Sequence, residues 1–191
     1  MERALIVSAG SSANQYLADH LAECGFARPV IAASGSEARR LAAGQEFAVM
    51  AINTPLPDEF GHELALDLAA GSTAGVLLLA GRDSADALAR RLGQHGVLVL
   101  AKPFSGGQFA GAVQLCAACS RRLAGLREEN RRLQNKIAQV RLVSRAKCLL
   151  VAAEGITEEE AHRRIEKLAM DTRRTRGEVA QEILAGGPPP E

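Results

Sequence analysis

The sequence has no long apolar run and no strong excess of charge of either sign. None of its apolar stretches approaches the roughly 20 residues that a membrane-spanning helix requires, so a membrane span is not expected. The start of the chain is too short and abrupt for a signal peptide and leads directly into an apolar segment, which predicts a cytoplasmic protein. The hydrophobic fraction of 47% and the charged fraction of 24% are those of an ordinary globular protein.

Cysteine and histidine are too few and too scattered to predict a metal centre. Cys116 and Cys119 form a Cys-x-x-Cys pair, but the pair lies inside a helical pattern and lacks the second pair of a zinc site. The four histidines stand singly. The sequence also offers no nucleophile paired with a base and no glycine-rich phosphate loop. We therefore expect no metal, no cofactor and no enzymatic activity.

The net charge of +1 conceals an uneven distribution along the chain. Residues 1–120 contain 8 Lys or Arg and 11 Asp or Glu, whereas residues 121–191 contain 15 and 11. A basic C-terminal part suits a polyanionic ligand, although a solvated helical surface would give the same balance. No Phe, Tyr or Trp follows Phe109. A nucleic acid bound there would be recognised through arginine planes, hydrogen bonds and shape instead of aromatic stacking.

Five short apolar segments alternate with helical patterns in the first part of the chain. The segments are rich in Val, Ile and Leu and are bounded by Gly, Ser, Pro or Asp, as expected for strands buried on both faces. They cover 4–7, 30–33, 48–52, 76–80 and 97–101. Helical patterns cover 14–24, 36–43, 63–70 and 84–94. Ser36 and Ser84 are expected N-caps, and Gly25 and Gly71 expected helix stops. The alternation predicts an α/β, doubly wound parallel five-stranded sheet.

From about residue 104 the pattern changes to one long helix that ends at Gly155. Apolar residues and one asparagine recur at alternating spacings of three and four, which predicts a coiled-coil linker over residues 119–141. This seam consists of Leu123, Leu126, Asn130, Leu133, Ile137 and Val140. A single asparagine in the seam, Asn130, favours a parallel homodimer, but basic residues beside the seam would face basic residues of the second helix and oppose this pairing. The alternative is that the stripe packs on its own domain.

Two shorter helices are expected after Gly155. Thr157 and Glu160 form a capping box for the first, whose apolar face continues to residue 169. The second spans about 178–185. Together with the end of the long helix they predict a three-helix all-α module. The remaining residues, 186–191, are Gly-Gly-Pro-Pro-Pro-Glu, and such a tail is expected to be disordered.

Residues 1–118 resemble the receiver domains of two-component systems, which have a flavodoxin-like fold. The resemblance implies a phosphoacceptor aspartate at the end of the third strand, where this chain has Asn53. Ser8 and Ala9 replace the acidic pair that holds Mg²⁺, and Ala80 replaces the hydroxyl residue that ends the fourth strand. Only the lysine after the fifth strand remains, as Lys102. An amide cannot attack phosphorus and Mg²⁺ needs carboxylates, so we expect a pseudo-receiver with a degenerate phosphoacceptor pocket.

Residues 128–185, which overlap the linker, resemble the ANTAR module, a three-helix RNA-binding unit of bacterial transcription antiterminators. Four blocks occur in the expected order: Ser-Arg-Ala-Lys-Cys-Leu-Leu at 144–150, Gly-Ile-Thr-Glu-Glu-Glu-Ala at 155–161, Leu-Ala-Met at 168–170, and Glu-Val-Ala-Gln-Glu-Ile-Leu at 178–184. Cys148 departs from the small residue usual after Arg-Ala-Lys. Arg176 departs from an apolar residue usual before Val-Ala. With the receiver-like part, the chain resembles the antiterminators of amidase and nitrate-assimilation operons.

The resemblance implies a dimer that grips a leader RNA folded into tandem hairpins, with a ligand-sensing protein as a possible regulatory partner. Arg145 and Lys147 lie at the centre of the family motif and are the first candidates for RNA contact, and Arg173 and Arg174 are the second. For Arg145 the alternative is a salt bridge to the next helix; for Arg173 and Arg174 it is a solvated turn.

Two other functions are compatible with the sequence. A DNA-binding response regulator would need a helix-turn-helix with an exposed recognition helix, and the last three helices lack that pattern. A non-catalytic dimerisation or adaptor protein would need only the seam, its basic surface being incidental.

Overall fold

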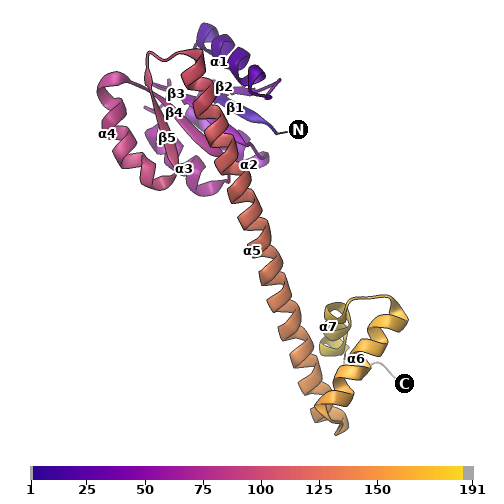
Figure 1. The fold of residues 1–191 in the computed structure, drawn as a ribbon. Coiled ribbons are helices and arrows are strands. Elements are labelled where there is room, and N and C mark those ends of the chain that lie inside the picture. The colour runs from indigo at the N-terminus through magenta and orange to yellow at the C-terminus, as the bar shows by residue number, and fades with distance from the viewer. Residues whose placement is uncertain (1, 187–191) are drawn as a thin grey trace. The chain divides into compact units, whose positions relative to one another are not determined.

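The computed structural model describes residues 2–186 and divides into two compact units, Met1–Leu126 and Arg127–Glu191. In the first unit, strands and helices alternate along the chain (Figure 1). The strands are β1 (Ala4–Val7), β2 (Val30–Ala32), β3 (Val49–Asn53), β4 (Gly75–Gly81) and β5 (Val97–Lys102). The helices between them are α1 (Ser11–Glu23), α2 (Gly35–Gly44), α3 (His62–Gly71), α4 (Arg82–Leu92) and the short 3₁₀ helix η1 (Gly93–His95).

The five strands form one parallel sheet in the order β2-β1-β3-β4-β5, which confirms the predicted fold class. One face of the sheet is covered by α2, α3 and α4, through buried residues such as Ala38, Leu64 and Leu92. The other face is covered by α1 and the start of α5, through residues such as Leu17 and Phe109. Both faces are therefore buried, which explains why the strands read as continuous apolar runs.

Several helix starts differ from the prediction. α1 begins at Ser11, three residues before the expected start. The N-cap of α2 is Ser34, whose side chain accepts a hydrogen bond from the Glu37 amide, so the choice of Ser36 was wrong. Ser84 lies inside α4, which follows Gly81 and has no side-chain cap. The hydroxyl of Ser84 instead donates back to the Gly81 carbonyl. Before α2 serine occurs at both 34 and 36, and the sequence alone did not show which one would cap.

The second unit contains the end of the long helix α5 (Gly106–Glu154), followed by α6 (Glu158–Thr172) and α7 (Arg176–Gly186). Gly155 has φ of 70° and follows the end of α5, as predicted. The predicted Thr157–Glu160 capping box is present at the start of α6. α7 begins two residues earlier than expected, directly after Thr175. Thr175 forms a second Thr-x-x-Glu pair with Glu178, and the two residues hydrogen-bond in the same reciprocal way. The expected disordered tail lies outside the described residues, apart from the residue that ends α7.

The core of this unit is made largely of small and branched side chains. Ala146, Ala161 and Ala180 are fully buried, with Ile165 and Ile183 between them. Alanine at these positions lets the end of α5 and the two shorter helices approach closely, which a small unit needs in order to bury an apolar core. Within residues 2–186, no helix has both the length and the apolar character needed to cross a membrane.

Candidate nucleic-acid interface and the pocket at the sheet edge

The predicted phosphoacceptor position lies where the carboxyl ends of β1, β3 and β5 meet. Asn53 ends β3, and its amide Nδ2 donates to the hydroxyl of buried Ser8 at 3.0 Å. Lys102 ends β5, and its Nζ donates to the Thr54 carbonyl at 2.5 Å. Partial burial lowers the pKa of Lys102. The Asn53 amide and the Lys102 ammonium group therefore each donate to a neutral partner.

The remaining positions of the pocket offer no ligand for a cation. Ala80 is fully buried at the end of β4, and Ala9 lies on the exposed loop after β1. A shallow hollow beside Asn53 and Lys102 is lined by aromatic and small residues, including Tyr16 and Phe104. In the part of the chain that the structure describes, no group of three or more His, Cys, Asp or Glu side chains could hold a metal. The hollow thus presents an amide and an ammonium group, and no carboxylate.

The loop after β3 is fastened to the start of α2. The carboxylate of Asp58 accepts hydrogen bonds from the amides of Gly35 and Ser36 at 2.9 and 3.0 Å, and from the Ser36 hydroxyl at 2.8 Å. These bonds, led by the Ser36 amide, hold the pKa of Asp58 well below its usual value. Glu59 forms an ion pair with Arg39, and a Cβ on Gly35 would collide with the Glu59 carboxylate. Sequence reasoning missed this clamp because its partners are more than 20 residues apart.

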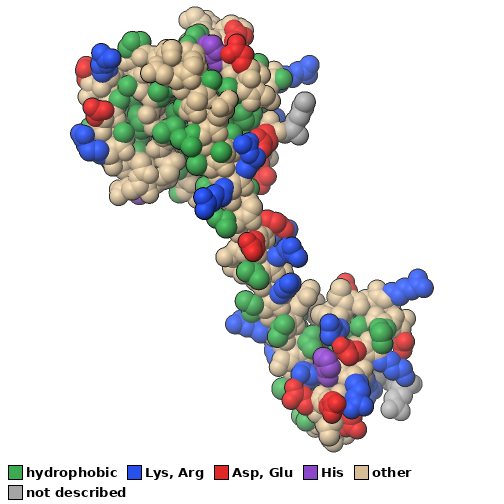
Figure 2. All heavy atoms as spheres, in the orientation of Figure 1, with side chains coloured by type: hydrophobic (Ala, Val, Ile, Leu, Met, Phe, Trp, Pro, Cys, Tyr) green, Lys and Arg blue, Asp and Glu red, His purple; other side chains and the backbone are tan. Residues whose placement is uncertain are grey.

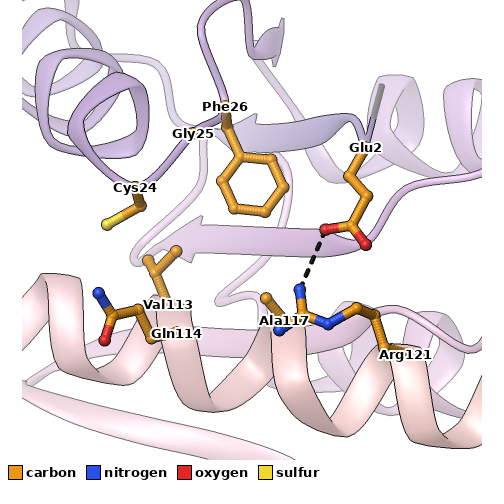
Figure 3. A pocket seen from close by; sticks show the side chains of 8 residues that line it. All are labelled: Glu2, Cys24, Gly25, Phe26, Val113, Gln114, Ala117 and Arg121. Carbon is orange, nitrogen blue, oxygen red and sulfur yellow. Dashed lines mark hydrogen bonds and ion pairs between the residues drawn. The ribbon is translucent and has the colours of Figure 1, made fainter.

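A second hollow of this unit lies between the end of α1 and α5 (Figure 3). Phe26, Val113 and Ala117 give it apolar walls, and the ion pair between Glu2 and Arg121, at 3.2 Å, borders it. Burial raises the pKa of the Cys24 thiol on its wall, so this cysteine is a poor nucleophile. The hollow therefore offers no reactive group.

The predicted coiled-coil seam lies on the outside of α5. Its five apolar residues, Leu123, Leu126, Leu133, Ile137 and Val140, are between 49% and 69% exposed. Figure 2 shows hydrophobic side chains at intervals along this helix, between charged ones. About half or more of each of these side chains is thus open to solvent in the single chain. The alternative, packing of the stripe on its own domain, does not occur in this structure.

The four predicted RNA contacts have different surroundings. Lys147 is only 19% exposed and forms an ion pair with Glu158 at 2.6 Å, whose hydrogen bond lowers the pKa of that glutamate. Arg174 pairs with Glu182 at 2.6 Å. Arg145 is exposed on α5, and Arg173 adopts a left-handed conformation with φ of 53° at the end of α6. The salt bridge considered for Arg145 is therefore made by its neighbour, Lys147.

An open groove between α5, α6 and the start of α7 brings two of these residues together. We call it the α5–α6 groove. Its cations are Lys136, Lys147, Arg174 and Arg176, whereas Arg145 and Arg173 do not line it. Figure 2 shows Lys and Arg side chains beside exposed hydrophobic ones on this unit. Arg176, the departure from the family pattern, pairs here with Glu166 at 2.8 Å.

Comparison with known proteins agrees with this division of the chain. Residues 131–184 match the model of the ANTAR domain. The chain carries an ANTAR domain. The transcriptional regulatory protein PdtaR of Mycobacterium tuberculosis is 29% identical over 182 residues, which cover 95% of this chain and 89% of PdtaR.

The first unit has the fold of a receiver domain. A receiver domain of a response regulator from Clostridium thermocellum superposes with a TM-score of 0.57 and 18% identity, covering 64% of this chain and 99% of that one. A structure described as an adenylate cyclase from Rhodopirellula baltica superposes with a TM-score of 0.60 and 21% identity, covering 68% and 97%. At these identities the likeness defines the fold and no activity.

Proposed function

We propose that this ANTAR-domain protein is a transcription antiterminator, without enzymatic activity, that binds hairpin RNA as a homodimer. The observation that supports RNA as the ligand is the ANTAR match over residues 131–184, in the same unit as the groove that collects four cations. Lys and Arg side chains can neutralise phosphates and release counterions, which makes binding steeply dependent on salt. The similarity to a regulator named for transcription supports the same role.

Dimerisation is the second element of the proposal. Two ANTAR modules held by one coiled coil can engage two adjacent hairpins, and the second contact then forms at a high effective concentration. The exposed apolar seam of α5 supports this arrangement. Asn130 is the core position that would fix the register of the pair.

The third element is a receiver-type domain that phosphorylation does not switch. Asn53 supplies an amide where a carboxylate is needed, and its bond to Ser8 occupies the place of a metal-binding acid. The domain would then transmit signals by contact with a partner, such as a ligand-sensing protein. Incubation with acetyl phosphate and Mg²⁺, followed by mass spectrometry, is expected to show no phosphoryl adduct. An adduct within the β3–α3 loop would contradict this element.

An electrophoretic shift with three nucleic acids tests the proposed function. We expect the full-length protein to shift a tandem-hairpin RNA and to leave an unstructured RNA of equal length and a duplex DNA unshifted at physiological salt. Preference for the DNA duplex would indicate a DNA-binding regulator. A dimer that shifts none of the three would indicate an adaptor protein.

A further inference from the structure

The α5–α6 groove combines two kinds of surface that a site for phosphate alone would not need. Met170 on α6 is 73% exposed and Val140 on α5 is 69% exposed, and both line the groove. Ala169 and Val143 continue this apolar floor. The four cations described above form its rim, and Glu166 is the acidic residue among its lining. A ligand that fits both parts has an apolar face and negative charge next to it.

The rim cations are available to such a ligand although three of them are paired. Lys147, Arg174 and Arg176 each contact one glutamate on the surface of this unit. The pairs of Arg174 and Arg176 are exposed on both sides, and exposed ion pairs contribute little to stability, so an incoming phosphate can replace the glutamate of either pair at small cost. Arginine can also bind a phosphate through two parallel hydrogen bonds, which favours the exchange.

We propose that the α5–α6 groove receives an unstacked base from an RNA hairpin loop, with the neighbouring phosphates on its cationic rim. This inference rests on the proposed function and adds a binding subsite to it. Met170 would lie against the face of the base, because a thioether packs favourably on aromatic rings and this unit has no Phe, Tyr or Trp. Bases within a duplex keep their faces stacked, so the floor selects a loop and not a stem.

A second copy of the chain is the other possible occupant, and the charges disfavour it. Val140, Ser144 and Lys147 continue the a and d spacing of the seam into the groove, so a partner helix would approach the same side. That helix would bring Arg141 of the partner subunit toward Lys136. The rim is already rich in cations, so it complements a polyanion better than another basic helix.

The test uses two matched pairs of variants in the full-length protein. Met170→Ala removes the exposed floor residue, and Val151→Ala removes an exposed apolar residue of α5 that does not line the groove. Arg176→Ala removes a rim cation, and Arg163→Ala removes a surface arginine that pairs with Glu159 outside the groove. All four residues are exposed, and circular dichroism melting checks that each variant folds.

The RNA probe is a hairpin enriched by the wild-type protein from a pool with randomised loop nucleotides. A second probe has the same stem and abasic loop nucleotides. We expect Met170→Ala to weaken binding of the first probe about two- to tenfold, the range for one contact between a thioether and an aromatic ring, and to leave binding of the abasic probe unchanged. Arg176→Ala is expected to reduce the slope of log affinity against log salt by about 0.7 for both probes. The two control variants should behave as the wild type does.

Three outcomes would overturn the inference, and they are distinguishable. If the wild type enriches no hairpin, the proposed function fails and the base subsite fails with it. If a hairpin is enriched and Met170→Ala binds it as tightly as Val151→Ala does, the subsite alone fails. If Met170→Ala raises the dissociation constant of the dimer in sedimentation equilibrium, the groove belongs to a second copy of the chain.

Discussion

Truncating one leucine of the exposed seam gives a direct test of dimerisation. Leu133 occupies a d position near the middle of the seam and is 53% exposed in the single chain. Leu133→Ala removes most of its apolar surface without adding charge. Since the side chain has few intramolecular contacts to lose, we expect the fold to be retained and the association to weaken.

The size of the effect follows from the exposed fraction. Full burial of a leucine side chain stabilises by about 1.5 to 3 kcal/mol, so covering the exposed half contributes roughly 0.8 to 1.5 kcal/mol. A symmetric dimer contains this residue twice, which gives about 1.5 to 3 kcal/mol for the pair. Each 1.4 kcal/mol corresponds to about a factor of ten, so the dissociation constant should rise about 10- to 150-fold.

Leu115 provides a matched control for this experiment. It lies on the same helix and is 55% exposed, but it falls outside the a and d positions of the seam. Sedimentation equilibrium over a range of protein concentrations gives the dissociation constants of the wild type, Leu133→Ala and Leu115→Ala. Equal constants for the two variants would refute the assignment of the seam. A wild type that is monomeric at tens of micromolar would refute pairing through α5 altogether.

Three further changes test the fold and the RNA surface. Gly75→Ala would place a Cβ against the Cys116 backbone of α5, and this overpacking should lower the free energy of unfolding in urea by about 1 to 3 kcal/mol. The control Gly71→Ala places its Cβ in open space and should not lower the free energy of unfolding. Equal free energies of unfolding for the two variants would contradict this packing. Asp58→Ala should lower the free energy of unfolding at pH 7. Hydrogen bonds depress the folded-state pKa of Asp58 below 3.8, so the difference in unfolding free energy between the wild type and Asp58→Ala should be constant above about pH 4 and shrink as the pH falls further. A difference that stays constant down to pH 2 would argue against the clamp. Lys147→Ala should weaken hairpin binding about tenfold, because one charge-assisted contact with a phosphate is lost, and it should leave the dimer intact. Unchanged RNA affinity at physiological salt would show that Lys147 is not part of the interface.

The fold could be predicted from local patterns because each of its elements has a local signature. Apolar runs such as 76–80 identify strands buried on both faces, and alternating spacings of three and four identify the long helix. The Thr157–Glu160 capping box is equally local, and it occurs as predicted. The Thr175–Glu178 pair has the same signature and could have been found by the same rule.

The features that sequence reasoning missed depend on residues brought together by the fold. The Asp58 clamp joins the β3–α3 loop to α2, and nothing near Asp58 in the sequence indicates that partner. The α5–α6 groove combines residues from three helices, so the exposure of Met170 could not be read from its place in an apolar pattern. The family motif directed attention to Arg145 and Lys147, of which only Lys147 lines the groove, and Arg176, which the motif presents as a departure, lines it as well.

The two units suggest how a receiver-type domain could regulate RNA binding without being phosphorylated. In its pocket Asn53 donates to Ser8 and Lys102 donates to the Thr54 carbonyl, and no carboxylate lines the hollow beside them. A ligand shifts a conformational equilibrium only if it binds one state better, and this pocket gives Mg²⁺ no carboxylate with which to do so. In the proposed function, control therefore acts on another surface. If RNA affinity depends on two linked modules, a partner that covers the α5 seam would abolish the gain from linkage, and binding to tandem hairpins would fall to that of a single hairpin.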